Sequence, residues 1–457
     1  MTPDQFRQYG HQTVEWIADF LSNPARYPVA ARVQPGQLTD ALPACGPENG
    51  EPMERILGDF ERLIVPAMTH WNHPGFMAYF ANSAPPEGIL GELLAAALNG
   101  NGMLWKTSPA VTELEQVVLG WMRQWSGLPA DWFGMIHDTA STGAMHAMAA
   151  ARAAADPEVR SRGGKPGLTV YVSEQAHTCM EKGAIAIGMG QEYVRRVPVD
   201  ADFRMSVDAL AGLIERDLAA GLRPCAVGAT VGTTGTTAVD PVPAIAELCE
   251  RHGIWLHVDA AYAGSAAIVP EFRWLFEGCE HADSLITNPH KWLLTPMDCS
   301  VFYTRRPEVL KRAFSLIPDI LYTADDPRAV NMMDYGVPLG RRFRALKLWF
   351  ILRSYGHEGL AAVIREHVRM AQEFACQVEA DPRFERTAPG CLSTICFRYK
   401  GTDEDNRRIQ DHVNESGEIL ISGTKLNGHF SLRLAIGNMA TTRAHVARAW
   451  ELIREAV

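Results

Sequence analysis

The chain lacks the features of a secreted, metal-binding or membrane-spanning protein. Its nine cysteines are an odd number, and no two are spaced C-x-x-C, which disfavours a disulfide framework and a zinc knuckle. No run approaches the roughly 18 apolar residues of a membrane span. The N-terminus, MTPDQFRQYG, has no basic-then-apolar signal. We therefore expect a cytoplasmic protein with no membrane contact and no metal.

Basic residues are also in the minority. The chain has 43 Lys and Arg against 53 Asp and Glu, for a formal net charge of −10. This balance argues against a nucleic-acid partner and against an anionic membrane surface. The length of 457 residues and the hydrophobic content of 47% are enough for a large core and two or three lobes.

The middle of the chain, residues 85 to 345, alternates between helical and apolar-strand patterns. The β-rich runs are LTVYVS (168–173), CAVGATVG (225–232), IWLHVDA (254–260) and SLITN (284–288), and a helical stretch (242–253) lies among them. Strands that are apolar throughout and joined by helices are typical of a mostly parallel sheet with helices on both faces. The sequence therefore predicts an α/β fold.

The two ends of the chain have a different pattern. Thr2, Pro3 and Gln5 have the residue types of a capped helix start, and the helix that follows has an uncharged stripe that requires a partner surface. A helix over 341–355 leads into a small lobe with strands at 393–400 and 430–437 and a last helix capped at Thr441 or Thr442. The segment 316–335 has no clear period and is predicted to be a long loop.

Two motifs in the middle region carry the strongest chemical signal. HVDAA (257–261) ends one apolar strand and NPHKW (288–292) follows the next, so Asp259 and Lys291 should meet at the carboxyl edge of the sheet. Pyridoxal phosphate needs an acidic group at its ring nitrogen and a lysine that forms an imine with its aldehyde. The alternative is structural: Asp259 in an ion pair and Lys291 on the surface.

Other segments could hold the rest of this cofactor. DTASTG (138–143) precedes a run of helix formers, so Ala140 and Ser141 could bind a phosphate at a helix start, although a plain helix cap has the same composition. His177 follows a strand and could stack on the cofactor ring, with Ala261 on the other face; the alternative is a core histidine. Thr234 in VGTTGTT (231–237) could donate to the ring substituents.

Taken together, these motifs resemble the group II pyridoxal-phosphate decarboxylases, specifically the aromatic-L-amino-acid decarboxylases. The likeness covers nearly the whole chain and includes HPGFMAYF (73–80), SPAVTELE (108–115), HVDAAYAGSA (257–266), NPHKWLL (288–294), DCSVFY (298–303) and PLGRRFRALKLWF (338–350). It implies a fold-type I enzyme that works as a homodimer with active sites at the interface. The expected division is a helical dimerisation segment (1–85), a large cofactor domain (86–345) and a small α+β domain (346–457).

The resemblance also implies residue roles. Lys291 would be the imine lysine, Asp259 the partner of the ring nitrogen and His177 the stacking histidine. The phosphate would be surrounded by Ala140, Ser141, Asn288 and His290, and the cofactor pocket completed by Thr234 and Ala261. An aromatic amino acid would be the substrate, bound by Trp71, Tyr79, Phe80 and Met297, with Asn101 and Met103 from across the interface. Gly340 would leave space near the substrate; in plant relatives glycine here accompanies indole substrates.

One position departs from the family pattern. The family carries a loop tyrosine that returns a proton to the substrate carbon, and the gapless match here is Ile320, with Tyr322 two residues later. If Tyr322 takes the role, the product is an arylalkylamine and CO2; if the hydroxyl is lost, an aldehyde synthase is the alternative. Two weaker alternatives are an aminotransferase and a binding protein without a cofactor. An aminotransferase would need an arginine that binds the substrate carboxylate, and Arg433 is the C-terminal candidate, but we expect Arg433 to be structural.

Overall fold

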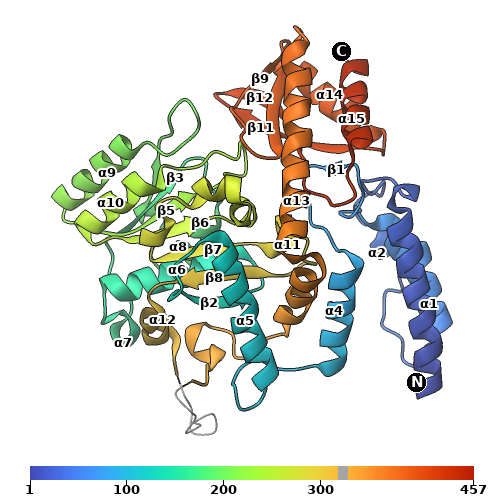
Figure 1. The fold of residues 1–457 in the computed structure, drawn as a ribbon, viewed down its shortest axis with the longest axis horizontal. Coiled ribbons are helices and arrows are strands. Elements are labelled where there is room, and N and C mark those ends of the chain that lie inside the picture. Colours follow the sequence, from blue (N-terminus) through green and yellow to red (C-terminus); the bar gives the residue numbers. More distant parts are fainter. Residues whose placement is uncertain (317–327) are drawn as a thin grey trace.

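A seven-stranded sheet forms the centre of the protein (Figure 1). The computed structural model describes residues 1–316 and 328–457. The sheet in this described part has the order β2-β8-β7-β6-β5-β3-β4. Strand β8 runs antiparallel to both of its neighbours, and the other neighbouring strands are parallel. The strands are β2 (Phe133–His137), β3 (Leu168–Ser173), β4 (Val194–Val197), β5 (Arg223–Thr230), β6 (Trp255–Asp259), β7 (Ser284–Thr287) and β8 (Ser300–Thr304). The predicted mostly parallel α/β sheet is confirmed.

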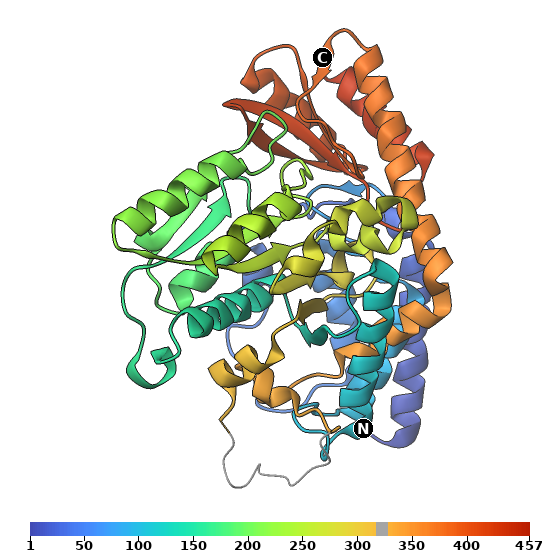
Figure 2. The same cartoon turned by 60° about the vertical axis from the view of Figure 1, so that its left-hand side comes forward.

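Helices cover both faces of this sheet because its strands place apolar side chains alternately on each face. In β8, Val301 and Tyr303 pack into one core cluster, and Phe302 packs into another. The first cluster includes residues of α9 (Val207–Ala219) and α10 (Val242–His252), and the second includes residues of α6 (Ala140–Ala155). Figure 2 shows the green α9 and α10 and the teal α6 on opposite sides of the strands.

Five further helices belong to this part of the chain. They are α5 (Pro109–Ser126), α7 (Val159–Arg162), α8 (Cys179–Ala186), α11 (Pro289–Trp292) and α12 (Pro307–Phe314). The segment 316–335, predicted to be a loop, contains a 3-10 turn at Met332–Tyr335, so that prediction was wrong for those four residues. The residues Ile320 and Tyr322 lie outside the described part of the chain.

A second, smaller sheet belongs mainly to the C-terminal part of the chain. Its order is β1-β11-β12-β10-β9, and the strands are β1 (Phe76–Met77), β9 (Phe384–Arg386), β10 (Thr394–Tyr399), β11 (Leu420–Leu426) and β12 (His429–Ala435). Its helices are α14 (Asp403–Glu415) and α15 (Arg443–Glu455), the latter with Thr442 as its N-cap. The short strand β1 pairs in parallel with β11, so the N-terminal segment contributes an edge to this sheet.

A long helix, α13 (Arg344–Ala380), joins the two sheets. It is broken at Gly356, where the backbone adopts φ 62° and ψ 176°, a conformation that favours glycine. The predicted helix over 341–355 therefore ends where expected, and a second helix follows without an intervening loop.

The N-terminal helices are the least buried part of the molecule. Helix α1 (Pro3–Ser22) has the predicted capping box between Thr2 and Gln5, and none of its residues is buried. The segment continues through α2 (Gln37–Ala41), α3 (Met53–Asp59) and α4 (Pro86–Leu98). Figure 1 shows α1 standing at one side of the molecule, away from the central sheet. Within the two described ranges, no helix combines the length and apolarity that crossing a membrane requires.

Candidate active site

A cavity of about 190 Å³ lies at the carboxyl ends of β5, β6 and β7. All nine residues predicted to bind the cofactor line it: Ala140, Ser141, His177, Thr234, Asp259, Ala261, Asn288, His290 and Lys291. Five further residues complete the lining: Phe80, Thr139, Thr230, Gly232 and Tyr262. The structure thus brings together residues that lie as much as 211 positions apart in the sequence, from Phe80 to Lys291.

Lys291 lies on the short helix α11, directly after strand β7. Burial lowers the pKa of its amine below the usual value, and the nearby carboxylate of Asp259 opposes that shift. The ammonium group lies 5.2 Å from the centre of the Phe80 ring. A lysine with a lowered pKa is more readily a free amine, which is the form that attacks an aldehyde.

Asp259 ends strand β6 and has both carboxylate oxygens engaged. Its Oδ1 accepts the backbone N–H of Ala261 at 3.0 Å, and its Oδ2 accepts the thiol of Cys179 at 3.5 Å. Among the residues that the structure describes, no lysine, arginine or histidine nitrogen lies within 4.0 Å of this carboxylate. Asp259 therefore has no ion-pair partner there, which disfavours the structural alternative.

Asn288 and His290 are held so that each presents a hydrogen-bond donor. The hydroxyl of Ser300 donates to Asn288 Oδ1 at 2.6 Å, which leaves the Nδ2 group as the free donor. The backbone N–H of Cys299 donates to His290 Nδ1 at 2.9 Å, and burial lowers the pKa of His290 to about 4. The ring is therefore neutral at pH 7 with its proton on Nε2. Two such donors in one cavity fit an anionic group such as a phosphate.

The start of helix α6 also lines the cavity. Thr139 is the N-cap residue, and its side chain makes no capping hydrogen bond. The first N–H groups of a helix lack partners within the helix and favour an anion. The uncapped geometry at Thr139, Ala140 and Ser141 therefore supports phosphate binding over a plain helix cap.

His177 and Thr234 are exposed residues of the cavity lining. The backbone N–H of Cys179 donates to His177 Nδ1 at 3.2 Å, so the imidazole is oriented by the start of helix α8. The neighbours on the inner side of the ring desolvate it in part, which lowers the pKa of His177 although the side chain remains exposed to the cavity. A neutral, oriented imidazole is suited to stacking on a flat ring, and the structural alternative of a core histidine does not fit its exposure.

The residues predicted for the substrate fall into two groups. Phe80 lines the cavity and stacks on Tyr262 with ring centres 3.8 Å apart, and Tyr262 stacks in turn on Trp292, next to Lys291. The other six residues predicted for the substrate do not line this cavity: Trp71, Tyr79, Met297, Asn101, Met103 and Gly340.

Within that second group, Trp71, Tyr79 and Met297 are exposed. Asn101 Oδ1 accepts the backbone N–H of Arg341, directly after Gly340. The carbonyl of Met103 accepts the backbone N–H of Met333. The six substrate assignments outside the cavity stay predictions.

Arg433 is buried and has carbonyl partners. Its Nε donates to the carbonyl of Gly235 at 3.1 Å and its Nη1 to the carbonyl of Tyr79 at 2.5 Å. These bonds connect β12 to the loop after β5 and to the segment after β1. These contacts agree with the expected structural role of Arg433, while its Nη2, which is also buried, has no hydrogen-bond partner among the described residues.

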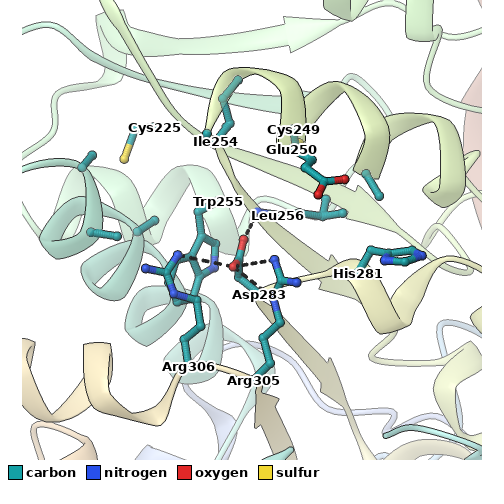
Figure 3. Close-up of a pocket in the computed structure, with 15 residues that line it drawn as sticks. Cys225, Cys249, Glu250, Ile254, Trp255, Leu256, His281, Asp283, Arg305 and Arg306 are labelled. Carbon is teal, nitrogen blue, oxygen red and sulfur yellow. Dashed lines mark hydrogen bonds and ion pairs between the residues drawn. The ribbon is translucent and has the colours of Figure 1, made fainter.

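A larger cavity, of about 330 Å³, lies at the opposite edge of the sheet, at the amino ends of β5 and β6. Figure 3 shows Arg305 and Arg306 on either side of the carboxylate of Asp283. Both guanidinium groups pair with that carboxylate, which also accepts the backbone N–H of Leu256. These contacts tie the start of β6 to the end of β8, and we assign no ligand to this cavity.

Comparison with known proteins decides the family. Residues 35–400 match the model of the pyridoxal-dependent decarboxylase conserved domain. The chain belongs to this decarboxylase family. Tyrosine decarboxylase 4 of Petroselinum crispum is 40% identical over all of this chain and 94% of its own length. Phenylacetaldehyde synthase of Arabidopsis thaliana is 40% identical over all of this chain and 96% of its own length.

Solved structures agree with the family assignment. The crystal structure of Oryza sativa TDC with PLP and tryptamine superposes with a TM-score of 0.97 at 36% identity and covers all of this chain and 98% of that one. The predicted fold-type I architecture and the pyridoxal phosphate cofactor are confirmed. This decarboxylase is a pyridoxal-phosphate-dependent carboxy-lyase that acts on an aromatic L-amino acid.

Several features of the site were missed from the sequence. Tyr262 follows the HVDAA motif directly, so its place in the lining had a local signal. Cys179 and Ser300 had none, because each contacts its partner through the fold: 80 residues separate Cys179 from Asp259, and 12 separate Ser300 from Asn288.

Proposed function

We propose that the enzyme releases CO2 from an aromatic L-amino acid and yields the arylalkylamine, with the residues of the 190 Å³ cavity holding the cofactor. The observation that carries this proposal is that Lys291, Asp259 and the two donors at Asn288 and His290 all line one cavity. A covalent anchor, a carboxylate for the ring nitrogen and an anion site are the three requirements of pyridoxal phosphate.

When bound, pyridoxal phosphate supplies an electron sink for the carbon that loses its carboxylate. Lys291 would hold the aldehyde, and Asp259 would keep the ring nitrogen protonated. His177 and Ala261 would lie on opposite faces of the ring, and Thr234 near its substituents. Ala140 and Ser141 would join Asn288 and His290 around the phosphate.

The aromatic substrate class is supported by the aromatic residues near the cavity and by the relatives. Phe80 lines the cavity, and Trp71 and Tyr79 stack on each other with ring centres 6.1 Å apart. Planar rings of this kind bind other planar rings by offset or edge contacts. We propose that these residues and Met297 bind the substrate ring, and that Gly340 leaves space for an indole.

An aldehyde product is the second candidate. It is favoured by the 40% identity to the Arabidopsis phenylacetaldehyde synthase and by Ile320 at the position expected for the loop tyrosine. Tyr322, two residues later, favours the amine. In either case the carboxylate is lost. The amine forms if a hydroxyl returns a proton to the substrate carbon, whereas the aldehyde, ammonia and peroxide form if dioxygen and water react there instead.

We also propose a homodimer with active sites at the interface, to which Asn101 and Met103 of one subunit contribute in the other. Helix α1 has no buried residue, and Phe6 and Val14 are 67% and 47% exposed. Helix α4 exposes four leucines, at positions 90, 93, 94 and 98. Exposed apolar surface of this extent is typical of an interface.

We propose that residues 1–85 form the dimerisation segment, 86–345 the cofactor domain and 346–457 the small domain. All nine cysteines are free thiols in the structure, which supports a reducing, cytoplasmic location.

A product assay tests the proposal. Purified enzyme loaded with cofactor is incubated with phenylalanine, tyrosine, dopa and tryptophan in turn, and CO2, amine, aldehyde, ammonia and peroxide are measured. Amine and CO2 in equal amounts are the expected result. Aldehyde with ammonia and peroxide would replace the proposal with its alternative, and no turnover of any aromatic amino acid would contradict both.

A further inference from the structure

A buried thiol touches the carboxylate that faces the cofactor ring. Cys179 is the first residue of helix α8, and its side chain is only 1% exposed. Its Sγ lies 3.5 Å from Asp259 Oδ2, which is hydrogen-bond distance for sulfur. The contact joins the segment after β3 to the end of β6.

The thiol is the donor in this contact. Burial, and then the charge of Asp259, raise the pKa of Cys179 well above its usual value, so the sulfur keeps its proton. The other carboxylate oxygen accepts the backbone N–H of Ala261 at 3.0 Å. With one donor on each oxygen, the carboxylate group cannot rotate without breaking a hydrogen bond.

The same residue also orients a second cofactor contact. The backbone N–H of Cys179 donates to His177 Nδ1 at 3.2 Å. The start of α8 therefore orients His177, which is proposed for the face of the cofactor ring, and Asp259, which is proposed for the ring nitrogen.

We propose that Cys179 is a positioning residue, whose S–H group holds the Asp259 carboxylate in the orientation that the cofactor ring nitrogen requires. The inference rests on the proposed role of Asp259. Without the thiol donor, Asp259 would be held by the Ala261 N–H alone, and cofactor binding would have to order the carboxylate.

A double-mutant cycle on cofactor affinity tests this role. Apoprotein of the wild type, Cys179→Ala, Asp259→Asn and the double variant is titrated with pyridoxal phosphate, followed by protein fluorescence and by the visible absorbance of the bound cofactor. We expect Cys179→Ala to weaken binding about fivefold in the wild-type background, which corresponds to about 1 kcal/mol. In the Asp259→Asn background we expect a change of less than about twofold, because the partner of the thiol is already altered.

Two further variants keep the test decisive. Cys179→Val removes the donor while filling the space, and it replaces Cys179→Ala in the cycle if the latter fails to fold. Cys225→Ala is the matched control, since Cys225 is 2% exposed but lies at the other end of the sheet. It should bind the cofactor as the wild type does.

The outcomes separate this inference from the function on which it rests. An equal loss of affinity from Cys179→Ala in both backgrounds, or no loss in either, would overturn the positioning role alone. A wild-type affinity and spectrum for Asp259→Asn would overturn both the proposed role of Asp259 and the inference.

Discussion

Replacing Ser300 with alanine should weaken the cofactor's phosphate contact, although Ser300 itself does not line the cavity. Ser300 is fully buried, and its hydroxyl donates to Asn288 Oδ1 at 2.6 Å. Without that donor, the amide of Asn288 can turn over and present its oxygen, in place of its N–H groups, to the phosphate. A hydrogen bond to a charged group contributes about 1.5–3 kcal/mol, so the dissociation constant of the cofactor should rise about 10- to 150-fold.

The assay compares pyridoxal phosphate with pyridoxal, which has the same ring and aldehyde but no phosphate. Apoprotein is titrated with each compound, and Ser300→Ala should lose affinity for pyridoxal phosphate while its affinity for pyridoxal changes less than about twofold. Ser431→Ala is the control, because Ser431 is equally buried and its hydroxyl has no partner among the described residues. An equal loss for both compounds would refute the argument that Ser300 acts on the phosphate through Asn288.

Three other perturbations have defined outcomes. Burial lowers the pKa of His367 to about 4, so the stability that the neutral imidazole contributes is lost as pH falls from about 6.5 toward 4. Between pH 7 and pH 5, the free energy of unfolding measured by urea denaturation should fall about 2 kcal/mol more for the wild type than for His367→Gln. Parallel pH profiles of the two proteins would contradict this. Tyr322→Phe should cut amine formation sharply, and unchanged turnover would mean that another group returns the proton. The double variant Phe6→Asp, Val14→Asp should sediment as a monomer, whereas Gln8→Glu should not; a dimeric double variant would remove α1 from the interface.

The parts of the fold that the sequence predicted are those with local signals. The strands predicted at 168–173, 225–232, 254–260 and 284–288 differ from β3, β5, β6 and β7 by at most two residues at either end, because each is a run of apolar residues that can be buried on both faces. The capping box at Thr2 is similarly local, since its two partners lie three residues apart. Such features depend on side-chain type and spacing alone.

Features that depend on distant contacts were not predicted. Strand β1 is two residues long and has no periodicity to detect, yet it pairs with β11 across more than 340 positions. The direct continuation of α13 beyond Gly356 was missed because a glycine at a helix end ordinarily predicts a loop.

The candidate site shows the same contrast. Asp259, Asn288, His290 and Lys291 could be placed at one edge because parallel strands end there together. The thiol of Cys179 could not be placed against Asp259, because nothing in the residues around either position specifies that contact.

Borohydride reduction of the enzyme with its cofactor bound tests the central claim most directly. The reductant fixes the bond between the cofactor and its lysine, and mass spectrometry of peptides from the digested protein then locates the added pyridoxyl group. The label should lie on Lys291 alone, and Lys291→Ala should take up none. A label on another lysine, or an unlabelled wild type that still decarboxylates its substrate, would contradict the assignment of the anchor and with it the proposed site.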